Sequence, residues 1–237
     1  VKQDEIENYV QNPWKIDDIE FLHVTSNETI NGIQLREFNK INHDSLIIDM
    51  SSDIGSYSFE WDNLAYIYAG AQKNMGIPGV SICIGDEQYL NMENNSKYLN
   101  LGQLVEKNSL LNTPPTFSIY ILKLVTDWMI QMGGVKYFEE KSIRQSSRLY
   151  EQLNSYKDFL LLPVCDYSKS RSNIIFKFEN NELEKKFLME AGEKGIIGLN
   201  GHRSEGGVRI SLYNSITDEM VDYLSEFIDQ FFVSNGK

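Results

Sequence analysis

Two residues that could carry covalent chemistry follow predicted strands in the first third of the chain. Asp49 ends the apolar run LIID, and Lys73 follows AYIYAG within the segment AGAQKNMGIPG. Strand ends of this kind lie at the edge where open α/β sheets bind ligands. The glycines near Lys73 allow close backbone approach, and a sheltered amine with a tuned pKa is what imine formation needs. Taken alone, Asp49 also fits a turn cap, and most lysines are surface cations.

A second group of candidates is cationic and lies near the C-terminus. The segment GHRSEGGVR places His202, Arg203 and Arg209 in and beside a glycine-rich loop of an acidic chain. In VRISLYN the apolar residues alternate with Arg209, so its side chain should point away from the core and be free to pair with a carboxylate. Arg203 also fits a solvated loop charge.

A third group precedes a predicted helix. Asn112 and Thr113 stand in NTPPT, directly before the apolar-periodic run at 117–132. Prolines at this place are typical of a helix start. Unpaired N–H groups and the positive end of the helix dipole form an anion site there. Alternatively, Thr113 only caps the helix.

Taken together, Asp49 and Lys73 supply what pyridoxal phosphate needs from a protein. Asp49 supplies an anion that keeps the pyridine nitrogen of the cofactor protonated, and Lys73 supplies an amine that reacts with its aldehyde. In addition, the segments SNETI, DMSSDI, YAGAQKN, NTPPTF, GHRSEGGVR and ISLYN resemble phosphoserine aminotransferase in this order, over nearly the whole chain. Gln72 argues against the similar cysteine desulfurases, which have a His before the lysine.

The resemblance implies a role for each matching residue. Lys73 would bind the cofactor through an imine, with Thr29, Asp49 and Gln72 as further cofactor contacts. Asn112 and Thr113 would reach across a homodimer interface to the phosphate of the partner's cofactor. Arg209 would bind the substrate α-carboxylate, and His202 and Arg203 would lie near the phosphate or the distal carboxylate of glutamate.

From this resemblance we expect the protein to catalyse the family's reaction. It exchanges an amino group between glutamate and 3-phosphohydroxypyruvate, giving O-phosphoserine and 2-oxoglutarate in serine biosynthesis. The family's N-terminal arm, its phosphate loop and its ring-stacking aromatic have no match in these residues, so we expect little or no activity from the chain as written. The alternative is a truncated, non-catalytic remnant or interaction subunit.

The elements that must position these residues follow from periodicity. We expect strands at 19–28, 45–52, 65–73 and 79–85, an irregular connection at 86–108, and helices at 117–132 and 136–153. A strand (173–179), a helix (182–191), two strands (195–200, 207–214) and a closing helix should follow, with Thr217 as the cap of that helix. Its apolar stripe, expected to be core, is Met220, Leu224, Phe227, Ile228 and Phe231.

These elements predict an α/β fold with two parts. By resemblance it is the aspartate-aminotransferase-like fold of type I pyridoxal-phosphate enzymes. Residues 1–138 would form part of the large cofactor-binding domain with a connecting helix. Residues 139–237 would form the small C-terminal α+β domain.

Composition narrows the partners to small molecules. The formal net charge of −12 and pI near 4.7 argue against nucleic acid and anionic membranes. The apolar run at 117–132 contains Lys123 and Asp127 and is too short to span a bilayer. Cys83 and Cys165 show no metal-ligand spacing, so we expect buried thiols in a reducing compartment, the cytosol, with no signal peptide in the text. His23 and His43 are interpreted as structural.

Overall fold

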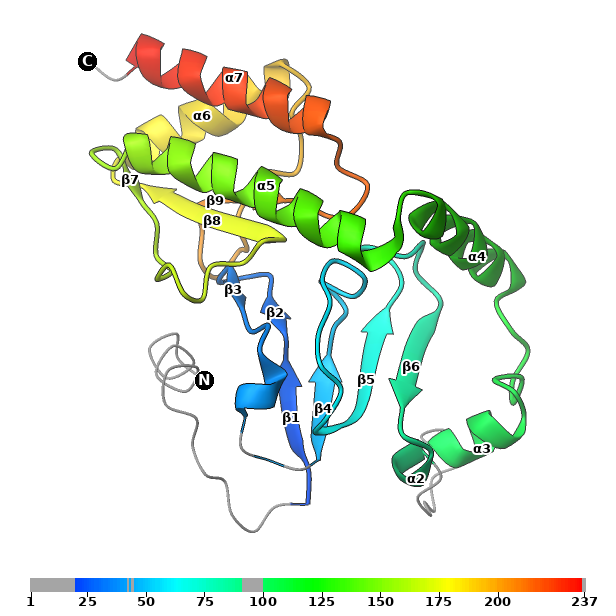
Figure 1. Ribbon diagram of the computed structural model, residues 1–237. Coiled ribbons are helices and arrows are strands. Elements are labelled where there is room, and N and C mark those ends of the chain that lie inside the picture. Colours follow the sequence, from blue (N-terminus) through cyan, green and yellow to red (C-terminus); the bar gives the residue numbers. More distant parts are fainter. Residues whose placement is uncertain (1–19, 42, 44, 91–99, 236–237) are drawn as a thin grey trace.

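The computed structural model describes residues 20–41, 43, 45–90 and 100–235. Figure 1 shows two lobes, one built on the β1, β4, β5 and β6 strands and one built on β7, β8 and β9 beneath three helices. Helices α4 (Thr116–Gln131) and α5 (Gly134–Ser155) connect the lobes. The candidate residues are therefore distributed over both lobes and their junction.

The first lobe contains a mixed four-stranded sheet in the order β1-β4-β5-β6. Strands β1, β4 and β5 run parallel, and β6 runs antiparallel to β5. Their bounds are Leu22–Thr25, Leu46–Asp49, Leu64–Gly70 and Ser81–Gly85. The four strands expected from the apolar runs are confirmed, since β-branched and aromatic residues favour the pleated, half-buried surface.

One face of this sheet is packed and the other is more open. Along β4 the burial alternates, with Leu46 and Ile48 buried and Ile47 and Asp49 partly exposed. The buried face packs against a cluster from residues 35–69 that includes Phe38 and Met50. Alternation with period two therefore places the Asp49 side chain on the face opposite this core.

A small hairpin extends the sheet lobe toward the second lobe. It consists of β2 (Asn27–Glu28) and β3 (Ile33–Gln34), followed by the 3₁₀ turn η1 (Phe38–Lys40). The sequence interpretation merged β2 with β1 and missed β3, because two-residue strands carry almost no periodicity. Gly32 turns the hairpin with φ 71°, and a Cβ at this residue would lie 2.7 Å from Ile175 in the other lobe.

The connection at 86–108 was predicted to be irregular, and this was wrong for its described parts. Short helices α2 (Glu87–Leu90) and α3 (Leu101–Glu106) lie there, and Asn100 caps α3 through its side chain. Residues 91–99 lie outside the described part of the chain. The two predicted helices that follow are confirmed as α4 and α5, and Gly133 separates them with φ 116°.

The second lobe is a three-stranded antiparallel sheet with helices packed on it. Its strands β7 (Leu160–Leu161), β8 (Asn173–Phe178) and β9 (Val208–Ser211) are ordered 7-8-9. Helices α6 (Asn181–Glu193) and α7 (Asp218–Asn235) complete it. Its core is separate from that of the first lobe and is rich in aromatic rings, which include Phe176, Phe187 and Phe231.

Three expectations about packing were wrong. Residues 195–200 form no strand beyond a bridge from Asn200 to Val208, because Gly195 and Gly198 adopt positive φ and Ile197 is 86% exposed. Met220 is exposed, although the rest of the α7 stripe is buried. Cys83 is also exposed, since β6 buries little of its length, and Cys165 is partly buried.

Two further expectations have different outcomes. The hydroxyl of Thr217 accepts the backbone N–H of Met220 at 3.3 Å, which confirms its capping role at the start of α7. The domain boundary at 138/139 remains a prediction, and it falls near the start of the continuous helix α5. Among the described residues, none of the helices combines the length and the apolar character that a membrane span requires.

Candidate active site

Asp49 stands at the carboxyl end of β4, between β1 and β5. Its strand partners are Thr25 and Tyr68. Its Oδ1 atom accepts the backbone N–H of Ser51 at 2.8 Å, and the side chain is partly buried. This contact fixes the orientation of the carboxylate at the open face of the sheet.

Tyr68 and His23 lie on the same face as Asp49. The Tyr68 hydroxyl is 2.9 Å from His23 Nε2, and the two rings stack. Burial raises the pKa of Tyr68, and the charge of Asp49 and its hydrogen bond raise that pKa further. His23, expected to be structural, therefore lies one side chain away from the Asp49 carboxylate.

Lys73 lies in the turn that follows β5. Its side chain is partly buried, and its Nζ has no hydrogen-bond or salt-bridge partner in the described part of the chain. Gln72 is exposed and folds back over Gly70, where an added Cβ would lie 2.4 Å from Gln72 Oε1. The Lys73 amine is therefore partly sheltered and has no partner in the part of the chain that the structure describes, as covalent binding of an aldehyde requires.

Direct hydrogen bonds hold the ends of β4 and β5 together. The backbone N–H of Gly70 donates to Ser51 Oγ at 3.1 Å, and Met50 N–H donates to the Tyr68 carbonyl at 2.8 Å. Because the strands are parallel, Asp49 and the Lys73 turn share one sheet edge. The expected association of these two residues is thus supported by the strand register.

Sequence reasoning missed Asn74, which anchors the Lys73 turn. Its Nδ2 donates to the Ile54 carbonyl at 3.1 Å, and its Oδ1 accepts the Asn214 N–H at 3.0 Å. Asn214 in turn donates from its own side chain to the Gly55 carbonyl at 3.1 Å. The signal that could have found this residue was its position inside a turn fed by a buried strand, where Asn often bonds to backbone.

Thr29 and Arg209 come together at the junction of the lobes. Arg209 alternates with the buried residues Val208 and Ile210, so the prediction that it points away from the core is confirmed. Its Nη1 donates weakly to the Thr29 carbonyl at 3.5 Å, and its buried Nε has no partner among the described residues. The guanidinium group is thus held near the hairpin with unused donor capacity.

A buried polar layer beneath these residues joins the two lobes. Asn27 Nδ2 donates to Ser52 Oγ and to Asn173 Oδ1, both at 2.9 Å. Ser170 Oγ donates to Asn27 Oδ1 at 2.5 Å. Composition gave no signal for this layer, because these polar residues read as turns in the sequence. It fixes the position of Arg209 relative to the sheet edge.

Asp53 is the charged member of this layer. Its Oδ1 lies 2.5 Å from Ser26 Oγ, and its Oδ2 accepts from Gln34 Nε2 at 3.0 Å. Ser26 Oγ also lies 3.0 Å from the Asp49 carbonyl oxygen. Burial raises the pKa of Asp53 to about 6, while its hydrogen bonds act in the opposite direction.

Two pairs of predicted site residues are not brought together with Asp49, Lys73 and Arg209 within this chain. His202 and Arg203 are exposed in a turn, where His202 Nδ1 is 2.8 Å from Ser204 Oγ. Asn112 and Thr113 are exposed ahead of α4, and the residue before the helix is Pro115, so Thr113 is not its cap. The start of α4 still reaches the Lys73 region, since Ser118 Oγ donates to the Pro78 carbonyl at 3.0 Å.

These residues fit pyridoxal phosphate. Asp49 brings a carboxylate to the open face, Lys73 brings an amine with no partner among the described residues, and Arg209 brings a guanidinium group to the lobe junction. The described residues contain no group of His, Cys, Asp and Glu side chains arranged to hold a metal ion.

The sequence is similar to known aminotransferases. The Aminotransferase class-V family model matches residues 4–224. Phosphoserine aminotransferase of Alkalihalobacillus alcalophilus is 40% identical over 213 residues, which are 89% of this chain and 59% of the relative. That of Geobacillus kaustophilus is also 40% identical, over 94% of this chain and 64% of the relative.

Solved structures show the same fold. Phosphoserine aminotransferase from Bacillus circulans subsp. alkalophilus aligns with a TM-score of 0.90 and 35% identity, over 98% of this chain and 66% of that one. The pyridoxal-phosphate-bound enzyme from Trichomonas vaginalis aligns with a TM-score of 0.84 and 29% identity, over 91% and 62%. The chain spans about 60% of the length of the sequence relatives it matches. It belongs to the class-V aminotransferase family.

Proposed function

We propose that the protein is a pyridoxal-phosphate-dependent aminotransferase that interconverts 3-phosphohydroxypyruvate and glutamate with O-phosphoserine and 2-oxoglutarate. The observation that carries this proposal is the unpaired, partly buried amine of Lys73 at the sheet edge that also bears Asp49. The names of the relatives support the choice of substrates. Bound pyridoxal phosphate would supply the electron sink for amino-group transfer.

Each residue of the sheet edge has a defined task in this proposal. Lys73 would hold the cofactor covalently and, once released, would carry a proton to and from the substrate carbon. Asp49 would hold the proton on the pyridine nitrogen. Its orientation at the sheet edge is set by the Ser51 N–H. Gln72 and Thr29 would contact the cofactor from the β5 turn and the hairpin.

The cationic residues would bind the substrate. Arg209 can form the bidentate pair that a carboxylate favours, because a guanidinium group presents paired N–H donors. His202 and Arg203 are exposed and therefore accessible to the phosphate or distal carboxylate of a substrate. The −12 net charge of the chain makes such local cations necessary for anionic substrates.

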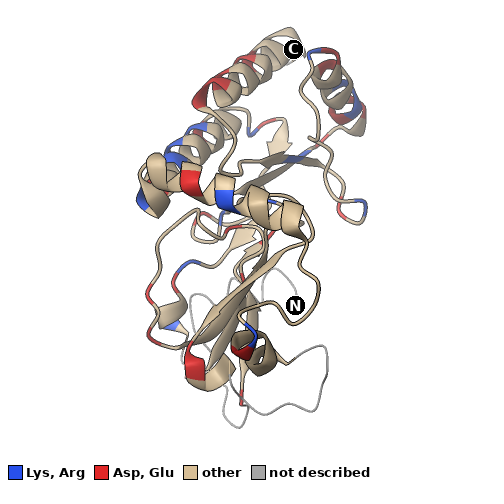
Figure 2. Cartoon of the chain, turned by 90° about the vertical axis from the view of Figure 1, so that its right-hand side faces the viewer, with Lys and Arg blue, Asp and Glu red and all other residues tan. Residues whose placement is uncertain are grey.

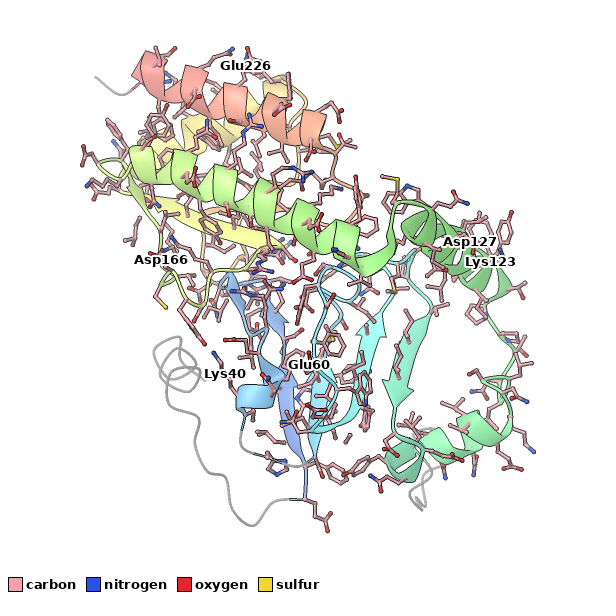
Figure 3. The ribbon with its side chains drawn as sticks, in the orientation of Figure 1. Lys40, Glu60, Lys123, Asp127, Asp166 and Glu226 are labelled. Carbon is pink, nitrogen blue, oxygen red and sulfur yellow. The ribbon has the colours of Figure 1, made fainter. Side chains whose placement is uncertain are left out.

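We further propose a homodimer with shared active sites in the cytoplasm. The residues before α4, Asn112 and Thr113, are exposed and would reach the phosphate of the partner's cofactor. Most of helix α4 is drawn in the colour of uncharged residues in Figure 2, and Figure 3 places its ion pair, Lys123 and Asp127, on its outer side. Its exposed apolar side chains, which suit an interface, include Phe117, Ile119, Tyr120, Leu124 and Ile130.

The experiment is a half-reaction with the purified protein. Pyridoxal phosphate is added, the visible absorption of the bound cofactor is recorded, and glutamate is then supplied while 2-oxoglutarate is measured. From these 237 residues alone we expect the half-reaction to be slow, but glutamate should still change the cofactor absorption and yield 2-oxoglutarate. Asp49→Asn should keep the Ser51 contact but slow this step by at least about a hundredfold.

Two results would point to the alternative reading. Protein that binds no cofactor, or that binds it and releases no 2-oxoglutarate, would favour a non-catalytic remnant or an interaction subunit. The mass and N-terminal sequence of the native protein then distinguish these readings, since a longer native chain would carry the segments that its relatives have in addition.

A further inference from the structure

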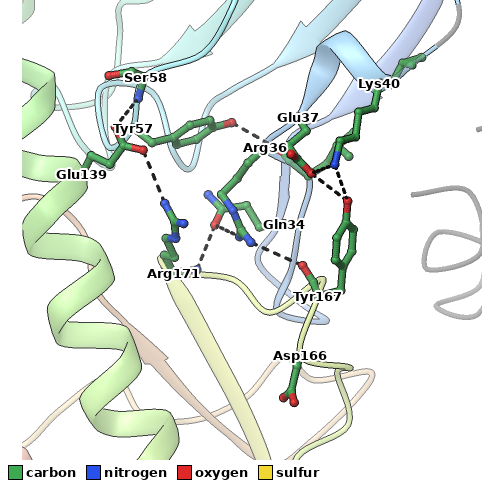
Figure 4. Close-up of a pocket in the computed structure, with 12 residues that line it drawn as sticks. Gln34, Arg36, Glu37, Lys40, Tyr57, Ser58, Glu139, Asp166, Tyr167 and Arg171 are labelled. Atoms are coloured by element: carbon green, nitrogen blue, oxygen red, sulfur yellow. Dashed lines mark hydrogen bonds and ion pairs between the residues drawn. The ribbon is translucent and has the colours of Figure 1, made fainter. Parts of the chain in front are cut away.

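A cavity lies at the junction of the lobes, and neither Asp49 nor Lys73 lines it. Its volume is about 470 Å³, and its walls come from η1 and β3, the start of α5 and the loop before β8. Figure 4 shows Arg36 and Arg171 extending into it from opposite lobes. None of the candidate active-site residues lines it.

Arg36 occupies the middle of this cavity without a carboxylate partner. Its Nη1 donates to Gln34 Oε1 at 3.1 Å and to the Lys169 carbonyl at 3.0 Å. Its Nη2 donates to the Tyr167 carbonyl at 3.5 Å. All three acceptors are neutral, and Arg36 forms no ion pair among the described residues; the charge of Glu37, which is bound by Lys40, acts on it only at longer range.

Arg171 faces the same space and is only loosely balanced. Its nearest carboxylate oxygen is Glu139 Oε1, 3.7 Å from Nη1, and the side chains are 27% and 29% exposed. The other Glu139 oxygen accepts the Ser58 N–H at 3.2 Å. Burial lowers the pKa of the Arg171 guanidinium, and the charge of Arg36 lowers it further. The two guanidinium groups are therefore close enough to repel each other.

The remaining charges at the cavity do not compensate them. Glu37 Oε2 is bound by Lys40 Nζ at 2.7 Å and by the Tyr167 hydroxyl at 2.8 Å, so these groups neutralise one another at the rim. Asp166 is 94% exposed and pairs with Lys169, and Figure 4 shows it turned away from the guanidinium groups. Figure 3 places Lys40 and Asp166 on the same outer side of the junction.

We propose that this cavity binds a small carboxylate anion between the guanidinium groups of Arg36 and Arg171. Guanidinium groups form paired hydrogen bonds with carboxylates, and such contacts are stronger in a partly desolvated site than on the surface. A bound anion would also touch both lobes at once, since Arg36 belongs to the hairpin of the first and Arg171 to the loop leading into β8. Binding at this site should therefore stabilise the lobe junction.

Malonate is the probe, and uncharged malonamide of similar size is its control. Binding is measured by calorimetry at constant ionic strength, in the unmodified protein and in Arg171→Gln and Arg144→Gln. Arg144 is the matched control, because its pair with Asp218 is exposed on α5. We expect Arg171→Gln to weaken malonate binding at least about tenfold, while Arg144→Gln binds it as the unmodified protein does.

A second measurement uses only the unmodified protein, so its result does not depend on whether a variant folds correctly. An arginine-specific reagent such as phenylglyoxal is applied to the unmodified protein, and the modified arginines are mapped by mass spectrometry. Malonate should slow modification of Arg36 and Arg171 and leave Arg144 unaffected. Equal binding of malonamide, malonate binding retained by Arg171→Gln, or no protection of Arg36 and Arg171 would each overturn the proposal.

Discussion

The backbone N–H of Asn214 donates a 3.0 Å hydrogen bond to Oδ1 of Asn74, and both residues are buried. This contact ties the residue after Lys73 to the segment that follows β9, the strand of Arg209. The amine and the guanidinium group are thereby positioned by one shared contact between the lobes, although they lie more than 130 residues apart in the sequence.

Replacing Asn74 by alanine should loosen this junction. Asn74→Ala removes the bonds to Ile54 and Asn214 and leaves the Asn214 N–H buried without a partner. We expect the free energy of unfolding in urea to fall by about 1–3 kcal/mol, and cofactor binding to weaken with it. Asn39→Ala, at an exposed position of η1, is the control. Equal stability of the two variants would contradict this role.

Asp53 should make stability depend on pH. Its pKa is raised to about 6 in the folded protein, above its unfolded value near 4, so the folded state binds the proton more tightly. Protonated Asp53 therefore contributes to the free energy of unfolding. This contribution is fully present below pH 4 and is lost as the pH rises through 6. The expected loss is about 3 kcal/mol, at roughly 1.4 kcal/mol for each pKa unit.

Asp53→Asn tests this dependence. The amide resembles the protonated carboxyl group, because its Nδ2 can donate to Ser26 Oγ while its oxygen accepts from Gln34 Nε2. The free energy of unfolding, measured with urea between pH 4 and pH 7, should depend less steeply on pH in this variant than in the unmodified protein. The exposed control Asp62→Asn should behave as the unmodified protein does. Parallel slopes in all three proteins would show that Asp53 does not titrate in this interval.

Arg209→Lys should weaken substrate binding. Lysine retains the charge but cannot form the paired hydrogen bonds of a guanidinium group, so the KM for glutamate should rise about tenfold or more. Arg148→Lys, at an exposed ion pair between α5 and α7, is the matched control and should leave the KM unchanged. A KM for glutamate that stays constant in Arg209→Lys would refute its role as the carboxylate ligand.

The sequence predicted the elements whose apolar residues recur with the period of a strand or a helix. The strands leading to Asp49 and Lys73, the helices α4 and α5, and the outward position of Arg209 all follow from alternating or helical apolar residues. The strand expected at 195–200 failed because its glycines adopt positive φ, which a count of apolar residues does not reveal.

The polar layer between the lobes could not be predicted from periodicity. Asn27, Asp53 and Asn173 contact one another or shared partners over separations of up to 146 residues, and each alone looks like a turn residue. Such pairings depend on how the two lobes pack. For the same reason the cavity between Arg36 and Arg171 had no sequence signal, because its two guanidinium groups come from different lobes.

The identity of the cofactor-binding lysine is the central claim, and borohydride reduction tests it most directly. The protein is incubated with pyridoxal phosphate, reduced and digested, and the pyridoxyl-bearing peptide is identified by mass spectrometry. The account predicts that the label lies on Lys73 in the segment AGAQKNMG, and that Lys73→Ala abolishes it while Lys136→Ala on α5 does not. Label found mainly on another lysine, or on none, would contradict it.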